Sequence, residues 1–491
     1  MLTLLLALLA PSAHAQCSDP TVLSVDTTTS TAAAYDLFGY ALVTADFDGD
    51  GYDDLGVGTP GRDVGGVTDA GQVTVFYGRS GGLSSASWSN WSQNSLSGSP
   101  NEAYDSLGQV LGAGDFNGDG YDDIVIGAPS EDQGSQVDAG RVFVKYGSAS
   151  GVTSSASSNS WSQASLAGNG SQAGDRMGAA VASGDFDGDG YDDLAIGVPD
   201  DDILGVSAAG RVIIMYGSSS GLSSSNSESF NQNNFGQTPH AADRFGTALA
   251  AGDFDNDGYD DLAIGSPGED RGGLPDVGLI LVKYGASVGL QSSTISEAFD
   301  NSGYGGVDKA YDHLGAVLAV GDLDGDGIDD LLMGVPDKNV NAHLNQGLVG
   351  VLLGNTSIGL IPAVARKVYA STSGYPYLNG LEFGGAGFAA DVNGDGDDDI
   401  LATAPRADSN AGILFVYHAS TIGTFGSDSY YVQEDCFAGG SVSSNEYFSW
   451  AVTAGDYDGD GVIEVMTGDR NHDLPGQSHA GIVLGAELSG P

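Results

Sequence analysis

Seven short acidic segments contain the residues of this sequence that are best suited to bind a cation. The first reads Asp46-Phe47-Asp48-Gly49-Asp50-Gly51-Tyr52-Asp53-Asp54, and the pattern starts again at Asp115, Asp185, Asp253, Asp322, Asp391 and Asp456. Carboxylate or amide side chains stand at positions 1, 3, 5 and 9, and position 6 is always glycine. Alternate residues of a tight loop point to the same side, so we expect these oxygens to converge.

Several hard oxygen donors in a flexible loop are typical of a Ca²⁺ site, and the backbone carbonyl at position 7 can add one more oxygen. The glycine at position 6 permits the positive φ of the turn. We therefore predict up to seven Ca²⁺ sites. Their predicted ligands are Asp46, Asp48, Asp50, Tyr52 and Asp54; Asp115, Asn117, Asp119, Tyr121 and Asp123; Asp185, Asp187, Asp189, Tyr191 and Asp193; Asp253, Asp255, Asp257, Tyr259 and Asp261; Asp322, Asp324, Asp326, Ile328 and Asp330; Asp391, Asn393, Asp395, Asp397 and Asp399; Asp456, Asp458, Asp460, Val462 and Glu464.

An EF-hand and a metal-free turn both fit these segments less well than a calcium loop of another kind. An EF-hand loop needs a bidentate glutamate at position 12 and flanking helices. Position 12 is here an apolar residue or threonine, from Val57 in the first segment to Thr467 in the last. Turns without a metal ion would leave seven clusters of like charge, and the repulsion within each cluster would be destabilising.

The chain is strongly acidic, with 66 Asp and Glu against 15 Lys and Arg and a formal net charge of -51. About half of the acidic residues lie in the seven segments, so the acidity is largely local. A surface of this charge repels nucleic acids and anionic membranes, and we expect neither as a partner. We find no His-Glu-x-x-His motif. Gly-x-Ser-x-Gly occurs at 78–82, 217–221 and 285–289, but no predicted helix follows these runs, so none fits a nucleophile elbow. The polar group of Arg470, His472, Asp473 and His479 fits an ordinary loop.

The acidic segments recur every 65 to 70 residues, which is the mark of a repeat architecture. Each unit is predicted to contain four strands. Examples are 245–251 before an acidic segment, 262–264 after one, 140–147 as a third strand and 161–166 as a fourth. A Gly-x-Pro triplet such as Gly127-Ala128-Pro129 ends the second strand. Short apolar runs bounded by Gly, Pro and Ser indicate strands, and four strands per unit indicate a propeller blade.

We therefore predict an all-β fold, a single seven-bladed β-propeller over residues 16–491. The last unit ends after its third strand at 481–485, and we expect the N-terminal strand 21–25 to complete blade seven, which removes exposed edges. An open β-solenoid would need shorter repeats. Residues 1–15 have the apolar run and small-residue cleavage site of a secretory signal peptide. No other stretch is long enough to span a membrane. In an exported chain, Cys17 and Cys436 are predicted to form a disulfide, with two unpaired thiols as the alternative.

The chain resembles the FG-GAP repeats of integrin α-subunit propellers and their bacterial relatives over nearly all of 36–491. The resemblance rests on Phe38-Gly39, Phe245-Gly246, the triplet at Gly127 and the Asp-x-Asp-x-Asp-Gly-x-x-Asp loops. It implies calcium in the hairpin between the first and second strands of each blade and a ligand surface on the opposite face. The sequence departs from the pattern at Thr403-Ala404-Pro405, Phe448-Ser449 and Gly468-Asp469.

We expect a secreted or cell-surface monomer that binds an extracellular protein or glycan, rather than a structural surface component or a hydrolase or lyase acting on glycans or phospholipids. Fold alone does not decide between these functions. The connections between strands two and three differ from blade to blade, and Asp201, Glu269 and Asp473 are expected to contribute to the ligand surface. Their acidity suggests a cationic or metal-bridged partner.

Overall fold

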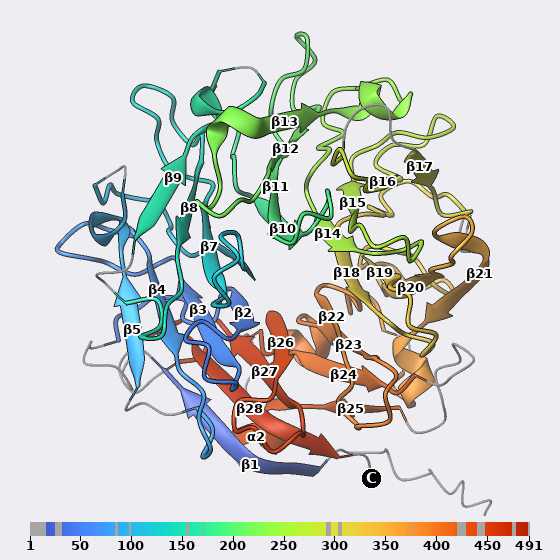
Figure 1. Cartoon of the computed structure of the whole chain (residues 1–491). Coiled ribbons are helices and arrows are strands. Elements are labelled where there is room, and N and C mark those ends of the chain that lie inside the picture. Colours follow the sequence, from blue (N-terminus) through green and yellow to red (C-terminus); the bar gives the residue numbers. More distant parts are fainter. Residues whose placement is uncertain are drawn as a thin grey trace, which may run out of the picture.

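The computed structural model describes residues 16–24, 32–83, 87–97, 100–153, 157–168, 170–290, 296–302, 307–376, 378–419, 429–438, 447–473 and 478–489. The predicted signal peptide, 1–15, lies outside these residues. The described chain forms seven four-stranded antiparallel sheets around a central axis (Figure 1). The predicted seven-bladed β-propeller is thereby confirmed.

Each blade runs from an innermost strand near the axis to an outermost strand at the rim (Figure 1). The innermost strands are β2 (Leu42–Ala45), β6 (Val110–Gly114), β10 (Ala180–Gly184), β14 (Leu249–Gly252), β18 (Val317–Gly321), β22 (Gly387–Ala390) and β26 (Ala451–Gly455). The second strands are β3 (Asp54–Thr59), β7 (Asp123–Ala128), β11 (Asp193–Val198), β15 (Asp261–Ser266), β19 (Asp330–Val335), β23 (Asp399–Ala404) and β27 (Glu464–Asp469). The third strands are β4 (Gln72–Phe76), β8 (Arg141–Lys145), β12 (Arg211–Met215), β16 (Leu279–Lys283), β20 (Leu348–Leu353), β24 (Ile413–Tyr417) and β28 (Ile482–Ser489). The outermost strands are β5 (Trp88–Trp91), β9 (Ser158–Trp161), β13 (Ser227–Phe230), β17 (Ser296–Phe299), β21 (Ile361–Val368), β25 (Tyr430–Val432) and β1 (Gln16–Leu23).

The two ends of the described chain close the ring. Strand β1 pairs antiparallel with β28, with Thr21 opposite Gly485 and Leu23 opposite Val483, in the sheet order β1-β28-β27-β26. The N-terminal strand is therefore the outermost strand of blade seven, as predicted, although it begins earlier than residue 21. Both segments lie side by side at the lower edge of Figure 1.

Two predicted strand positions were wrong. The outermost strand of blade two is Ser158–Trp161, and residues Gln163–Ser165 form a 3₁₀ turn instead of continuing the strand. The chain turns there because the Gln163 side chain is buried and its Nε2 donates to Asp201 Oδ1 at 3.0 Å. In blade four the innermost strand begins at Leu249, since Gly246 has a φ of 90° and belongs to the preceding turn.

Within the described residues, helices are few and short. The α-helical segments are α1 (Ala407–Asn410) and α2 (Glu434–Ala438), and the 3₁₀ turns are η2 (Gln93–Ser95), η3 (Gln163–Ser165), η4 (Ser224–Asn226), η5 (Gln232–Phe235) and η6 (Ala370–Ser373). Over the described residues, none of the helices has the length and apolar character needed to cross a membrane.

The hydrophobic core lies mostly between neighbouring blades. One cluster, for example, joins Val73 and Trp91 of blade one to Ile124 and Phe143 of blade two. The second residue of every acidic loop is part of this core; these residues are Phe47, Phe116, Phe186, Phe254, Leu323, Val392 and Tyr457, each at most 4% exposed. Each loop is therefore anchored by an apolar side chain next to its first carboxylate.

The two glycine signatures meet at the blade junctions. A Cβ atom on Gly127, the first residue of the Gly-x-Pro triplet, would lie 2.3 Å from the carbonyl oxygen of Gly178, the glycine of the next Phe-Gly position. The same close approach joins Gly58 to Gly108, and Gly468 of blade seven to Gly39 of blade one. A side chain at these positions would push neighbouring blades apart.

We expect Gly127→Ala to lower the free energy of unfolding by about 1–3 kcal/mol, because the added methyl group collides with backbone. Gly170→Ala is the matched control, since a Cβ there meets nothing within 4 Å, and its effect should stay within about 0.5 kcal/mol. Urea unfolding followed by tryptophan fluorescence measures both variants. Equal midpoints for the two would contradict this account of the signatures.

Candidate metal-binding loops and the opposite face

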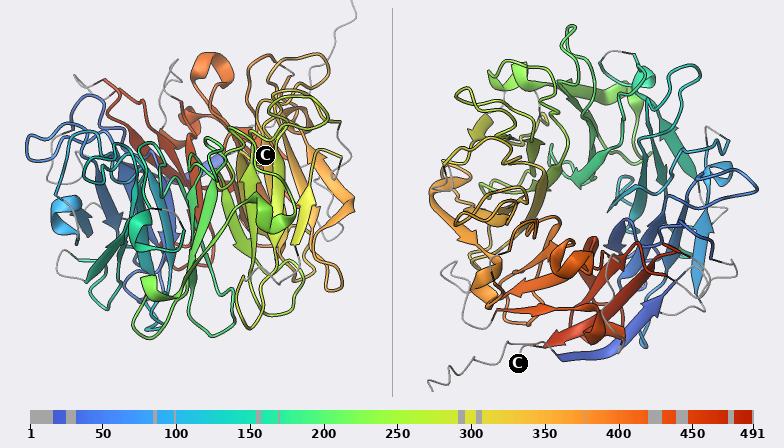
Figure 2. Two further views of the ribbon diagram at one scale, coloured as in Figure 1. Left: turned by 90° about the horizontal axis from the view of Figure 1, so that it is seen from above. Right: turned by 180° about the vertical axis from the view of Figure 1, so that it is seen from behind.

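The seven acidic loops connect the innermost strand of each blade to its second strand. Because the strands of every sheet alternate in direction, these loops all lie on one face of the propeller, and the connections between second and third strands lie on the other (Figure 2). The two faces are called here the acidic-loop face and the opposite face.

Backbone hydrogen bonds hold the carboxylates of each loop in place. In loop one, Asp46 Oδ1 accepts from the N–H of Gly49 at 2.7 Å, and its Oδ2 accepts from the N–H of Gly51 at 3.0 Å. Asp48 Oδ1 accepts from Asp50 N–H at 3.2 Å, and Asp50 Oδ1 accepts from Tyr52 N–H at 3.1 Å. The loop thus folds around its own acidic side chains.

The carboxylate at position 9 begins the second strand and is buried beneath the loop. Asp54 is fully buried, with Oδ2 accepting from Phe47 N–H at 3.1 Å and Oδ1 from Gly78 N–H at 2.8 Å. Burial, with repulsion from Asp48 and Asp46, raises the pKa of Asp54 to about 8. Burial likewise raises the pKa of Asp123, Asp193 and Asp330 to about 8, that of Asp261 to about 9 and that of Glu464 to about 7.

The donor sets fit a hard divalent cation. Carboxylate oxygens of Asp456, Asp458, Asp460 and Glu464 lie within 4.8 Å of one another, and the sets Asp46–Asp48–Asp50 and Asp185–Asp187–Asp193 meet the same limit. Within the described chain, Asp255 Oδ1 and Asp324 Oδ1 are buried without a hydrogen-bond partner. Oxygens of this kind are the ligands that Ca²⁺ takes in proteins. A cation would also offset the burial and the repulsion that raise the pKa values of the position-9 carboxyls.

Loop six differs from the other loops. Its position-3 residue, Asn393, donates from Nδ2 to Asp399 Oδ1 at 3.3 Å, and His418 Nδ1 lies 2.8 Å from Asp399 Oδ2. An amide and an imidazole therefore stand around the position-9 carboxylate. Loop two also has an asparagine, Asn117, but Tyr146 follows its third strand where His418 follows that of blade six.

The aspartate at position 8 has a role that its place in the sequence does not reveal. Its Oδ2 accepts a hydrogen bond from the backbone N–H of the position-1 aspartate in the preceding blade, as from Asp46 to Asp122 at 3.0 Å. The same bond joins Asp115 to Asp192, Asp185 to Asp260, Asp253 to Asp329, Asp322 to Asp398 and Asp456 to Asp53, at 2.8–3.1 Å. Neighbouring acidic loops are therefore linked. Loop seven has Ile463 at position 8, so the carboxylate acceptor is missing between blades six and seven.

Two residues expected on the ligand surface lie in the interior instead. Asp201 is fully buried against Arg211, with Nε 2.7 Å from Oδ2, and Glu269 is 5% exposed and accepts from Gln232 Nε2 at 2.7 Å. The residue two positions after the proline turns inward, and the sequence does not reveal this direction. Asp473 is on the loop itself, where Oδ1 accepts from His479 N–H at 2.8 Å.

The polar group of blade seven is also tied into the structure. Arg470 Cζ lies 3.2 Å from the centre of the Trp450 ring, and the rings of Tyr40 and Tyr447 lie 5.4 and 5.5 Å away. His472 Nδ1 lies 3.2 Å from Asp469 Oδ2. These contacts account for the group as part of the blade structure.

Exposed apolar side chains gather on the opposite face. Leu204 is 90% exposed, and Tyr35, Tyr104, Tyr311 and Leu344 are 58–64% exposed. The leucines lie in connections between second and third strands, and the tyrosines lie in the connections that lead into an innermost strand. The two kinds of connection touch each other, as shown by the hydrogen bonds from Tyr104 N–H to Thr68 O and from Tyr311 N–H to Pro275 O. The three tyrosines have φ values of 64–72°, and the equivalent residues of blades three and six are Gly174 and Gly380. Tyrosine occupies this position in three blades although glycine would fit the left-handed backbone without strain.

The repeat fold and its loops define a class of protein, a closed seven-bladed propeller with an acidic loop in every blade. The FG-GAP repeat family model matches residues 38–76, 107–144, 177–215, 245–282, 314–352 and 383–417. The chain is therefore an FG-GAP-repeat protein. The matched ranges end before blade seven, where the signatures are altered.

Curated relatives share parts of this propeller. The chain is 30% identical over 260 residues to integrin alpha pat-2 of Caenorhabditis briggsae, which is 50% of this chain and 19% of that protein. It is 32% identical over 251 residues to integrin alpha-5 of Xenopus laevis, covering 50% of this chain and 21% of that one. It is 35% identical over 161 residues to phosphatidylinositol-glycan-specific phospholipase D of Mus musculus, covering 33% and 18%. The similarity thus spans about a fifth of each relative's length.

Among solved structures, a rhamnogalacturonan lyase of Bacillus licheniformis matches with a TM-score of 0.35 and 14% identity, over 94% of this chain and 68% of the lyase. A likeness at this level supports no inference about function. The FG-GAP repeats and the integrin α similarity are the findings that characterise the chain.

Proposed function

We propose that this protein is a calcium-bound interaction module that acts outside the cell and binds a protein or glycan through its opposite face. FG-GAP propellers are a scaffold for interaction, and the contrast between the two faces carries the proposal. The acidic-loop face repeats one pattern of carboxylates seven times, whereas the opposite face exposes tyrosine, leucine and valine side chains that differ between blades. Exposed apolar groups of this kind mark binding surfaces.

The partner that fits this face has both apolar and basic groups. The half-buried Asp132 and the exposed Asp270 lie on the same connections as the exposed Val137 and Leu274, and the exposed Asp473 lies on the equivalent connection of blade seven. A cationic surface would therefore be attracted, and an anionic polymer would be repelled. The observations on the described residues do not favour a structural component, or a hydrolase or lyase, over this binding function. Secretion rests on residues 1–15 and remains a prediction, as does the monomeric state.

Calcium should raise the melting temperature, because a ligand that binds the folded state alone adds about 2.7 kcal/mol per site at a concentration 100 times its Kd. The measurement is a thermal melt of metal-depleted protein against protein in millimolar calcium at matched ionic strength. Asp50→Ala should reduce the gain, and Glu102→Ala, an exposed carboxylate on the opposite face, should leave it unchanged. A melting temperature that does not respond to calcium would exclude the metal sites.

The pH dependence gives an independent control for the same experiment. In metal-depleted protein the position-9 carboxyls have folded pKa values near 8, raised above the usual value near 4, so the stability that they contribute is present at low pH. It is lost as the pH rises from about 4 to about 8. The metal-depleted protein should therefore melt at a higher temperature at pH 5 than at pH 8. Calcium holds the carboxylates ionised, so its addition should reverse this order.

A bond between Cys17 and Cys436 would fix the closure of the ring. Helix α2, which contains Cys436, packs against strand β1. Cys17 lies in β1, at the backbone position opposite Leu488. This packing supports the proposed pairing. Titration of free thiols in the unreduced, denatured protein should find none, and reduction should lower the melting temperature, since a cross-link over so long a loop is worth about 4–5 kcal/mol in the chain-entropy model. Two titratable thiols would disprove the bond.

The two faces can be compared once a partner is isolated by pull-down or glycan-array screening of the mature protein in calcium. The double variant Tyr104→Ala/Leu204→Ala should weaken binding about tenfold or more, as expected for the loss of central apolar contacts. Val288→Ala/Ile358→Ala is the matched control, because these residues are 51% and 60% exposed in loops of the acidic-loop face. Both variants should keep the parental melting temperature. If only the control variant lost binding, the binding surface would lie on the acidic-loop face and the proposal would be wrong.

A further inference from the structure

A second set of buried charges lies beneath the opposite face, one group in each of blades one to five. Each group contains an aspartate three residues before the glycine of the Phe-Gly position: Asp36, Asp105, Asp175, Asp243 and Asp312. The second member lies two residues after the proline that follows the second strand: Arg62, Glu131, Asp201, Glu269 and Lys338. The five groups can be compared directly because they occupy equivalent places in the repeat.

In four of these blades the chain itself supplies a lysine or arginine. Arg62 Nη1 lies 2.5 Å from Asp36 Oδ2 in blade one, and Lys338 pairs with Asp312 in blade five. In blades two and three the second member is acidic, and an arginine from the start of the third strand compensates it. Arg141 Nε lies 3.5 Å from Glu131, and Arg211 Nε lies 2.7 Å from Asp201.

Blade four lacks this cation. Its second member is the acid Glu269, and the third strand begins with Leu279 where its two preceding neighbours have arginine. The nearby arginines are engaged elsewhere, Arg244 with Asp200 and Arg271 with Asp300. Among the described residues, no lysine or arginine forms an ion pair with Asp243 or Glu269. Two buried carboxylates therefore face each other, and His240 lies above them.

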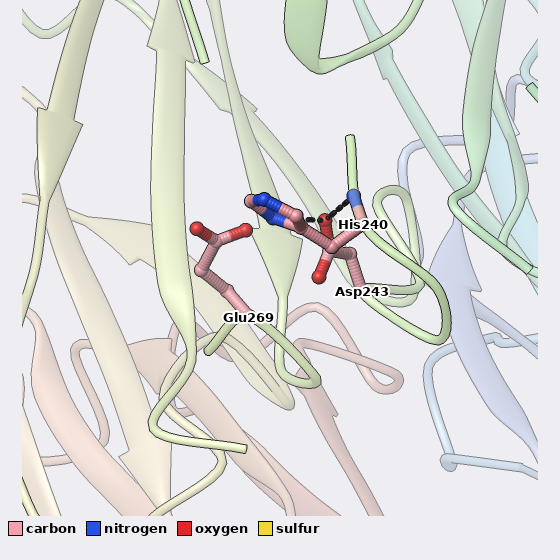
Figure 3. Close-up of side chains that lie close together, drawn as sticks. All are labelled: His240, Asp243 and Glu269. Carbon is pink, nitrogen blue, oxygen red and sulfur yellow. Dashed lines mark hydrogen bonds and ion pairs between the residues drawn. The ribbon is translucent and has the colours of Figure 1, made fainter. Parts of the chain in front are cut away.

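The three side chains converge (Figure 3). One ligand atom from each of His240, Asp243 and Glu269 lies within 4.8 Å of the other two. Asp243 Oδ2 accepts from His240 N–H at 2.6 Å and lies 3.7 Å from Nδ1 of the same residue. Gln232 Nε2 donates to Glu269 Oε2 at 2.7 Å and so fixes the second carboxylate.

Two further features distinguish this cluster from a merely structural acid pair. The Asp243 side chain is 1% exposed, and its Oδ1 has no hydrogen-bond partner among the described residues. The His240 side chain is 57% exposed, so the imidazole can turn between solvent and the carboxylates. The cluster thus has a preformed buried part and one accessible ligand through which an ion could enter.

We propose that His240, Asp243 and Glu269 bind a divalent transition-metal ion of the Zn²⁺ class. Imidazole nitrogen favours such ions, whereas Ca²⁺ prefers oxygen ligands alone. The ion takes the place that an arginine or lysine side chain fills in the neighbouring blades. With three protein ligands it retains a position open to solvent or to a partner, on the face where the exposed apolar side chains lie.

The test uses the full chain in saturating calcium, which occupies the oxygen-only loops, with Co²⁺ as the probe. Nitrogen ligation in a low-coordinate site gives cobalt a strong visible absorption, and octahedral oxygen ligation gives only a weak one. The parent should show the strong band and lose it on addition of Zn²⁺. His240→Ala and Glu269→Gln should each weaken Co²⁺ binding by about tenfold or more, whereas His313→Ala, which removes a histidine paired with Asp337 in blade five, should not.

Leu279→Arg provides the converse variant, because it gives blade four the arginine of blades two and three. It should suppress Co²⁺ binding, with folding checked by a calcium-dependent melt. If this variant does not fold, the Co²⁺ binding of His240→Ala and Glu269→Gln still tests the metal site. Burial and the neighbouring Glu269 raise the pKa of Asp243 to about 7. A proton shared between Asp243 and Glu269 is therefore the alternative to a metal ion as the means of reducing their repulsion. A parent without the strong cobalt band, or an equal band in His240→Ala, would overturn the metal site.

Discussion

A hydrogen bond between neighbouring acidic loops joins six of the seven pairs of adjacent blades and ties the ring to the acidic loops. The backbone N–H that it uses belongs to the first aspartate of one loop, and the acceptor is the eighth residue of the next, as in the bond from Asp46 to Asp122. The same nine residues therefore collect donor oxygens, anchor an apolar side chain in the core and join two blades. A cation in one loop would order the backbone whose N–H reaches the neighbouring carboxylate. Cation binding in a loop would thus be coupled to blade docking by geometry.

This coupling explains why so much like charge is tolerated. Clustered aspartates are costly in a folded protein unless hydrogen bonds or a cation balance them. Here every position-1 carboxylate accepts backbone N–H groups of its own loop, as Asp46 does. In loops one to five the position-9 carboxylate accepts two more at the start of the second strand. The backbone supplies directional donors, but it cannot neutralise the net charge. Burial, together with the repulsion that remains between the carboxylates, therefore keeps the pKa values of the position-9 carboxyls raised.

Much of this structure could be predicted from the sequence, because its strongest signals are periodic. The repeated acidic segment and the unmatched strands at both ends sufficed for blade number and ring closure. The direction of single side chains was not predictable. Asp201 and Glu269 lie in segments that read as exposed polar turns, yet they point inward because Gln163 and Gln232 of the preceding blade reach them. The role of position 8 could not be predicted for the same reason, since in five of the six pairs its partner is 75–77 residues away in the chain and adjacent only in the folded ring.

The departures from the repeat fall at one junction, between blades six and seven. Thr403 stands where other blades have the first glycine of Gly-x-Pro, and Ser449 stands where they have the glycine of Phe-Gly. By the repeat register these two positions meet. Both members of the glycine contact therefore differ at this junction. Ile463 removes the carboxylate acceptor at the same junction, and it packs instead against an apolar cluster that includes Phe437 of α2 and Phe448. Helix α2 in turn packs against β1 and β28. The junction thus replaces a glycine contact and a polar link with apolar burial, beside the blade in which the two ends of the chain pair.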